Sequence, residues 1–280
     1  MLATLKRILR LWRVYGYIDF MMLTRDLKTF LIWVLSDTVL NIAGVTGMIL
    51  LAARFDGIGV WTQAQVLFLL GYAMAVSGLI DLFFNCNIAY ISRRIGRGQL
   101  DHVLVQPQPI WMSLLTEGFI PFSGGIIVLP GIALLGVATA KAGVILTFGW
   151  LLLLGLNLVG SVLVVLAFSF LWGSLAFWSP RAAEEICSPI HALLNQMRVY
   201  PLDRMSRALK GSLMTALPVG FVAWYPSRAL LGMDTGTWDR FGTLWAGIAF
   251  SLPAILVFWR GLKHYERTGS QRYLNYGHRR

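Results

Sequence analysis

The most specific local signal for function lies in a polar stretch between two apolar runs, residues 87–113. It contains three arginines, a glycine and an aspartate at short spacing: Arg93, Arg94, Arg97, Gly98 and Asp101. Asp101 follows Arg97 by four residues, the spacing at which side chains pair on a helix. Basic loops also arise simply as orientation signals in membrane chains. Here Gly98 and Pro107 impose a shape on the stretch, which predicts one amphipathic helix and a turn.

Two sets of polar residues lie inside apolar runs, where an ionisable side chain is costly unless it is paired or faces water. The first set is Asp37 and Asn41, and the second is Ser77, Asp81 and Asn85. Steps of four residues place each set on one helix face. We predict that these stripes line a substrate path between protomers. The alternative is that they hydrogen-bond to neighbouring helices, as most polar groups in bundles do.

Residues 179–239 allow two topologies. Hydropathy favours a fifth span at 212–231, with a basic cytoplasmic loop before it. The second topology places the fifth span at 182–200 and makes 201–239 a re-entrant hairpin in the outer leaflet. In that case the span has a polar face that contains His191, Asn195 and Arg198.

The elements that must position these groups are membrane helices. The chain has 280 residues, of which 57% are hydrophobic and 13% are charged, whereas soluble domains carry roughly 25% charged residues. This composition excludes a soluble enzyme, because so much apolar surface would leave very large exposed patches. Six spans of about 22 residues each would leave roughly 150 residues for tails and loops, which is too few for a large extramembrane domain.

The positive charges predict the orientation. The net charge is +11, and lysines and arginines gather in residues 1–28, in 87–113 and after Trp259. Cytoplasmic loops of membrane proteins collect such residues, and the leaflet that they face is anionic. Both termini are therefore expected in the cytoplasm, and the charge is attributed to membrane lipid rather than to nucleic acid.

The apolar runs predict an all-α polytopic membrane protein with six transmembrane helices in residues 29–260. Residues 1–28 form an amphipathic segment expected in the headgroup plane, and 261–280 form a basic cytosolic tail. Besides the disputed fifth span, the expected spans cover about 29–53, 64–86, 114–139, 143–178 and 240–260.

The sequence contains no Walker A loop, HExxH helix, GxSxG elbow or Rossmann glycine fingerprint. The stretch GRGQLDH at 96–102 lacks the lysine and hydroxyl residue that hold phosphate and magnesium. Any ATP-driven work must therefore come from another polypeptide.

Three stretches together resemble one family. IGRGQLDHVLVQP, at 95–107, is similar to the Ile-x-x-Gly-x-Leu-Asp-x-x-Leu-x-x-Pro pattern after the second span of ABC-2 type transporter permeases. The resemblance is to the six-span subgroup related to multidrug and viologen-type exporters. Residues 200–232, with a Tyr-Pro-Leu start, and 259–273, beginning Trp-Arg-Gly-Leu, resemble two further motifs of this subgroup.

The resemblance implies an N-terminal interfacial helix, six spans, a cytosolic coupling helix in 87–113 and a re-entrant hairpin in 201–239, as in type V exporters. It therefore favours 182–200 as the fifth span. It also implies two copies of a separate ABC ATPase, which would hold ATP and magnesium, and a second permease, identical or homologous. The second and fifth helices of the two permeases would form the pathway. No cofactor is expected in this chain itself, which would be an exporter subunit for hydrophobic or amphiphilic compounds in a bacterial inner membrane.

Two rival functions stay open at this point. The first is a proton-coupled secondary transporter that uses Asp37 or Asp81, since intramembrane carboxylates serve as proton relays. The second is a membrane-embedded enzyme or scaffold acting on lipids, for which Glu184, Glu185 and His191 would supply the acid and base groups.

Overall fold

A computed structural model describes residues 2–84, 91–233, 236 and 238–269, and all regular secondary structure in this part is helical. The first two helices are α1 (Leu2–Arg25) and α2 (Leu27–Arg54). Asp26 separates them, because its carboxylate accepts a hydrogen bond from the Thr29 backbone N–H at 3.1 Å and so caps α2. Hydrogen bonding to Thr29 holds the pKa of Asp26 below its usual value.

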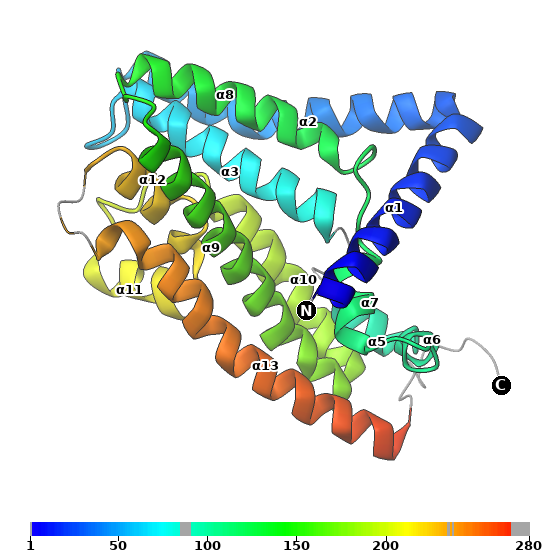
Figure 1. The fold of residues 1–280 in the computed structure, drawn as a ribbon. Helices are drawn as coiled ribbons and strands as arrows, with labels where there is room; N and C mark the ends of the chain where they lie inside the picture. Colours follow the sequence, from blue (N-terminus) through cyan, green and yellow to red (C-terminus); the bar gives the residue numbers. More distant parts are fainter. Residues whose placement is uncertain (1, 85–90, 234–235, 237, 270–280) are drawn as a thin grey trace.

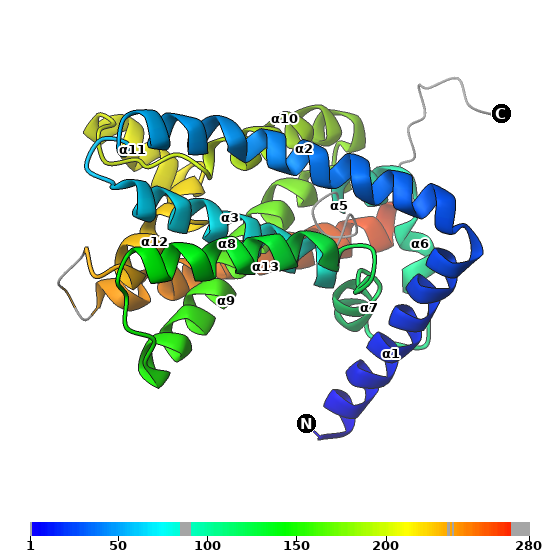
Figure 2. The same cartoon turned by 90° about the horizontal axis from the view of Figure 1, so that it is seen from above.

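Two pairs of helices make the most extensive contacts in the molecule (Figure 1). In one pair α3 (Gln63–Phe83) packs along α8 (Val128–Lys141). In the other, α9 (Phe148–Gly173) packs along α13 (Gly242–Thr268). Seen from above, α2, α10 and α11 lie along one edge of the molecule and α1 and α9 along the other (Figure 2).

Glycines allow the paired helices to approach closely. A Cβ atom on Gly71 of α3 would lie 2.6 Å from the backbone nitrogen of Leu135 in α8. In the second pair, a Cβ on Gly160 would lie 2.8 Å from the backbone nitrogen of Leu244. Close backbone contact through small residues is typical of helices that pack within a bilayer, where the hydrophobic effect does not hold them together.

The substitution Gly71→Ala is expected to destabilise the protein by about 1–3 kcal/mol, because the added methyl group meets the α8 backbone, which cannot rotate away. Thermal unfolding in detergent, followed by circular dichroism, measures the effect. Gly136→Ala on α8 is the control, since nothing lies within 4 Å of its Cβ position. There alanine should be neutral or stabilise by about 0.5–1 kcal/mol. Equal melting temperatures for the two variants would contradict the close packing.

Short helices lie at the two ends of these pairs. One end carries α5 (Ile91–Gly96), α6 (Leu100–Leu104) and α7 (Ile110–Thr116). Of these, α5 packs on η2 (Ser174–Phe177) and on α10 (Pro180–Met197), whereas α7 contacts α6 and α1. The buried core at this α5–α6 end consists of Ile91, Ile95, Leu100, Val103, Ile110, Leu114, Ala176, Phe177, Ala183, Phe258, Leu262 and Tyr265.

The continuous helix expected over 114–139 is wrong. The chain leaves α7 after Thr116, passes through a turn, and resumes helix at η1 (Gly125–Ile127), which leads into α8. The reason is tertiary. The buried carboxylate of Asp19 in α1 accepts hydrogen bonds from the backbone N–H of Phe122 at 2.8 Å and of Ser123 at 3.1 Å. These bonds satisfy backbone groups that a helix would otherwise have paired.

Residues 212–231, the span favoured by hydropathy, do not form one helix. They are divided among α11 (Arg207–Thr215), η3 (Val219–Phe221) and α12 (Trp224–Leu230). Pro218 contributes to the break, because a residue that precedes proline avoids helical geometry. In contrast, α10 is one helix of 18 residues, about 27 Å long. The lengths of these helices therefore argue against one continuous span at 212–231.

Three helical stretches in the described residues are long and apolar enough to cross a membrane: Gln63–Phe83, Phe148–Phe177 and Asp239–Thr268. The last of these includes the short η4 (Asp239–Phe241) ahead of α13. Helix α8 is apolar but shorter. The fold is thus that of an all-helical membrane protein.

Candidate functional site

Residues 91–105, which we call the basic segment, form two short helices joined by a tight turn. Gly98 has a φ of 68°, which favours glycine. Its N–H donates to the Ile95 carbonyl at 3.0 Å, and the N–H of Gln99 donates to the Arg94 carbonyl at 3.0 Å. This Schellman pattern ends α5. Arg97 and Asp101 therefore do not share a helix, and the expected four-residue spacing on one helix is not formed.

The first arginine of the segment connects it to α10. Arg93 Nε lies 3.0 Å from Glu184 Oε1. The two side chains are 41% and 29% exposed, so the ion pair is partly screened by solvent. The pair therefore matters mainly for position, because it joins α5 to the first turns of α10.

The second arginine connects the segment to the end of α7. Arg94 forms an ion pair with Glu117, and these side chains are only 13% and 12% exposed. Gln106 Nε2 also donates to Glu117 Oε1 at 3.3 Å. Tyr15 of α1 lies close to this pair: burial raises the pKa of Tyr15, the Glu117 carboxylate raises it further, and Arg94 opposes the change. The pair is thus enclosed by three parts of the fold.

The third link runs to the last helix. Asp101 accepts a hydrogen bond from the Tyr265 hydroxyl at 2.6 Å. The Tyr265 ring packs against Phe177, with 5.8 Å between ring centroids. The inner side of the basic segment is therefore attached to α10, to the end of α7 and to α13. Its outer side leaves five side chains exposed: Arg97, Gln99, His102, Leu104 and Val105.

Two residues of the polar stripe predicted on α3 interact with other groups of the protein. Ser77 is buried, and its hydroxyl donates to the Ala73 carbonyl one turn earlier, at 2.9 Å. Asp81 is half-buried and interacts electrostatically with Arg198 of the α10 end. Asn85, the last member of the predicted stripe, lies outside the described residues.

The stripe predicted on the first span stays untested. Asp37 and Asn41 lie on α2, and their side chains lie outside the described residues. Asp81 of α3 and Arg198, which follows the last residue of α10, are distant in sequence but interact electrostatically.

Only two of the three polar residues predicted to share a face on α10 point into the protein. His191 is 6% exposed and follows the buried Cys187 by one turn. Arg198 also points inward, and its Nε is buried without a hydrogen-bond partner in the described part of the chain. Asn195 is exposed. His191 and Arg198 therefore belong to the buried side of α10, and Asn195 belongs to its exposed side.

An acidic hub that the sequence analysis missed lies at the opposite, α11–α12 end. Asp203 accepts hydrogen bonds from the indole N–H of Trp61 at 2.5 Å and of Trp224 at 2.7 Å. It also forms an ion pair with Arg228, and the side chains of this pair are 12% and 21% exposed. Lys210 lies over the Trp224 ring, 4.4 Å from its centroid. One carboxylate thus joins the loop before α3 to the segment that follows α10.

A simple signal could have identified two of the missed residues. Glu117 and Asp203 are single acidic residues in or beside apolar stretches. A carboxylate in such a place is expected to have a cationic or hydrogen-bonding partner. The partners themselves are far away in the sequence and could not be named from it.

The groups considered for acid–base catalysis are already engaged. Glu184 pairs with Arg93, and Glu185 pairs with Arg181 at 3.2 Å on the exposed side of α10. No group of three or more His, Cys, Asp or Glu side chains among the described residues could hold a metal ion. Both glutamates are therefore engaged in ion pairs within the protein.

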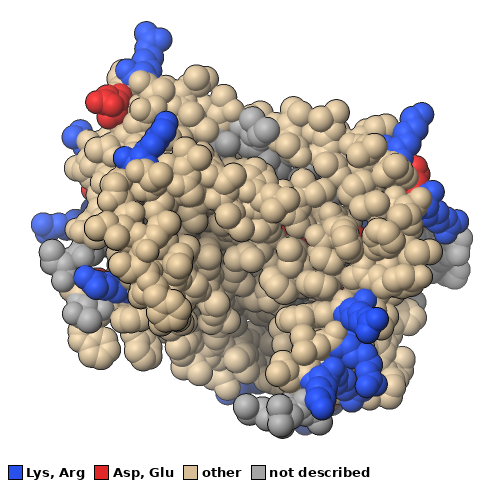
Figure 3. Space-filling model, turned by 45° about the horizontal axis from the view of Figure 1, so that its top comes forward, with Lys and Arg blue, Asp and Glu red and all other residues tan. Residues whose placement is uncertain are grey.

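The surface agrees with a membrane environment. Charged side chains gather at opposite margins of the face in Figure 3, and a broad surface between them is almost free of charge. Together with the three long apolar helices, this pattern defines an all-helical, multi-pass membrane protein with a braced basic segment at one end.

A family model described as "ABC-2 family transporter protein" matches residues 38–269, which is most of the chain. The chain belongs to this family, and the match confirms the predicted resemblance to ABC-2 type permeases. Membership makes it a permease component of an ABC transporter, a class that associates with an ABC ATPase. Comparisons with curated proteins and with solved structures find no match.

Proposed function

We propose that this chain is the membrane subunit of an ATP-binding cassette exporter that moves a hydrophobic or amphiphilic compound. ATP and magnesium would bind to the partner ATPase, and this chain would carry out no hydrolysis itself. The observation that supports the proposal most directly is the basic segment. It presents exposed side chains outward, while Arg93, Arg94 and Asp101 hold its inner side to three other parts of the fold.

The links suggest how movement would pass into the membrane. When the two ATPase copies close on ATP, they would press on the exposed side of the basic segment. The buried side chains of Ile91 and Ile95 pack against the core around Phe177, so α5 would move as a rigid unit. Glu184 on α10 and Tyr265 on α13 would then follow their partners. The fifth and sixth spans would tilt relative to α3.

A second permease, identical or homologous, would complete the pathway. Helices α2 and α10 lie along the same edge of the molecule (Figure 2). On α10, Asn195 and Gln196 are exposed, and polar side chains at membrane depth face water or protein rather than lipid. We assign this edge to the contact between the two permeases. Asp81 and Arg198 would lie beside the resulting path.

Orientation follows from charge. The α5–α6 end would face the cytoplasm, together with both termini, in a bacterial inner membrane. The hairpin of α11 and α12 would then lie in the outer leaflet, with Asp203 holding it to the loop before α3.

Val105 provides the sharpest test of the ATPase contact, because its side chain is 82% exposed at the end of α6 and takes no part in the internal links. Val105→Asp is expected to reduce binding of the ATPase about tenfold or more, as for loss of an apolar interface residue. Affinity purification of the tagged permease measures the ATPase that stays bound, and the mass of the complex gives the number of each subunit.

Thr268→Asp is the matched control, because it adds the same charge to an exposed position of α13, outside the basic segment. It should retain the ATPase. Full binding and full ATP-driven export by Val105→Asp would contradict the proposed contact. Transport that continues without any ATPase, and collapses with the proton gradient, would instead support the secondary transporter that uses Asp37 or Asp81.

A further inference from the structure

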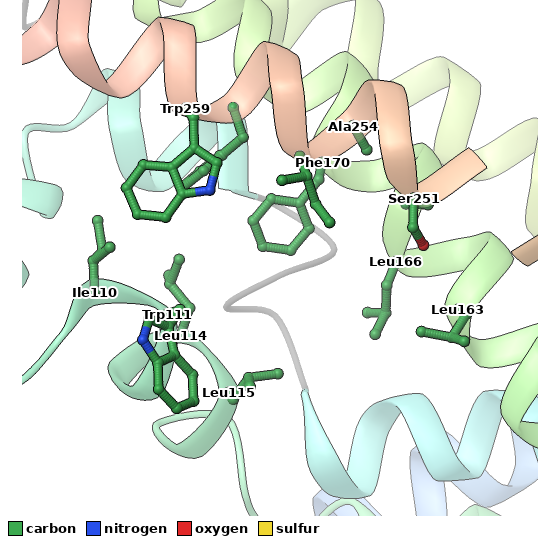
Figure 4. A pocket seen from close by; sticks show the side chains of 13 residues that line it. Ile110, Trp111, Leu114, Leu115, Leu163, Leu166, Phe170, Ser251, Ala254 and Trp259 are labelled. Carbon is green, nitrogen blue, oxygen red and sulfur yellow. The ribbon is translucent and has the colours of Figure 1, made fainter. Parts of the chain in front are cut away.

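A pocket of about 310 Å³ opens between α7, α9 and α13 (Figure 4). Its size falls in the range typical of small-ligand sites. The walls are aliphatic and aromatic: Leu114 and Leu115 come from α7, Leu166 and Phe170 from α9, and Phe258 from α13. Neither the links of the basic segment nor the interaction of Asp81 with Arg198 involves the side chains that line this pocket, so the pocket needs its own explanation.

The walls offer almost nothing to a polar ligand. The Ser251 hydroxyl is already used, because it donates to the backbone carbonyl of Gly247 at 2.7 Å. An ordered water needs two to four polar partners, and these walls do not provide them. The pocket is therefore suited to a hydrocarbon chain.

The position of the pocket points to the lipid bilayer. Helices α9 and α13 are two of the helices long and apolar enough to cross a membrane. At one end of the pocket Trp111 and Trp259 flank the opening, and they are 40% and 44% exposed. The other end, near Leu163 and Ser251, lies about two helical turns earlier on α13, nearer the middle of the apolar stretch Asp239–Thr268 (Figure 4). Tryptophans favour the depth of the lipid headgroups, so the mouth lies at the interface and the interior lies in the hydrocarbon.

Positive charge follows directly beyond the mouth. Arg260, Lys263 and Arg267 are exposed on the last turns of α13, where Glu266 is the single acidic residue. Lys263 lies one turn after Trp259, on the same face of the helix. A headgroup held at the mouth by these cations would be negatively charged.

We infer that this pocket binds one acyl chain of an anionic phospholipid, with its phosphate near Lys263 and Arg260. The inference depends on the membrane position of the chain and not on the direction of transport. It also gives α7 a partner: the lipid chain fills the space between α7, which directly follows the basic segment, and the α9–α13 pair.

The test is a lipid titration of the full chain in its purified complex, in neutral detergent, followed by native mass spectrometry. Dioleoylphosphatidylglycerol and dioleoylphosphatidylcholine are compared, since they share their acyl chains. Leu166→Trp fills the pocket and should weaken binding of both lipids about tenfold. Leu152→Trp adds the same bulk to an exposed position of α9 outside the pocket, and should bind as the unmodified protein does.

The double substitution Arg260→Gln and Lys263→Gln tests the headgroup without altering the packing. Each removed charge should weaken phosphatidylglycerol binding about fivefold, while phosphatidylcholine binding stays unchanged. Equal binding of the two lipids by the unmodified protein, or unchanged binding by a folded Leu166→Trp variant, overturns the inference. Displacement of the lipid by a compound that the complex exports also overturns it, because the pocket would then be a substrate site.

Discussion

Arg94→Glu is expected to abolish ATP-driven transport while ATP hydrolysis by the complex continues. The substitution places two carboxylates together where the side chains of the original pair are 13% and 12% exposed. Breaking a buried ion pair costs about 3–5 kcal/mol, since the remaining charge loses its partner. The basic segment would then separate from the end of α7, and movement of the ATPase would no longer reach the membrane helices. Proteoliposomes that contain the permease and ATPase allow transport and hydrolysis to be measured together.

The reversed pair is the most informative control. Arg94→Glu combined with Glu117→Arg restores opposite charges, and should recover much of the stability and part of the transport. Arg97→Glu changes the same charge on the exposed side of the segment. It should weaken ATPase binding and leave the melting temperature unchanged. If Arg94→Glu transports as well as the unmodified protein, the braced segment is not the route of coupling.

Asp203→Ala is expected to produce the largest loss of stability among substitutions at the α11–α12 end. It removes the acceptor of the Trp61 and Trp224 indole N–H groups and leaves Arg228, 21% exposed, without this carboxylate. We expect a loss of about 3–5 kcal/mol, which corresponds to a fall in melting temperature on the order of 10 °C. Differential scanning fluorimetry in detergent measures the shift.

Two comparisons separate the effect of this hub from ordinary surface charge. Asp203→Asn keeps one acceptor oxygen but loses the charge, so an intermediate melting temperature is expected. Arg181→Ala removes an ion pair with Glu185 whose side chains are 62% and 65% exposed. Such a pair contributes about 0.3–0.5 kcal/mol, so its loss should be almost undetectable. A similar small effect for Asp203→Ala would show that the hub does not hold the hairpin in place.

Much of the helical structure could be predicted from local pattern. The boundary expected near residue 28 lies close to Asp26, where the carboxylate caps α2. The basic segment was expected as a helix and a turn, and Gly98 does end α5. These features depend on neighbours in the chain, which hydropathy, capping residues and glycine positions describe directly.

Hydropathy failed at two apolar stretches. Residues 114–139 and 212–231 are apolar enough for spans, yet both are broken in the structure. In the first, Asp19 accepts hydrogen bonds from the turn before α8. Apolar composition reports that a stretch is buried or faces lipid. It does not report which other part of the chain satisfies its backbone groups.

The amino-acid sequence by itself determined the membrane class and the family and marked the residues of the basic segment, because composition and short motifs are sufficient for these. Only the tertiary structure decided what those residues bind within the chain. Arg93 meets Glu184 across 91 positions, and Asp101 meets Tyr265 across 164. Such pairs depend on how whole helices pack. That packing is set by close approach at sites such as Gly71 and Gly160, which no local pattern encodes.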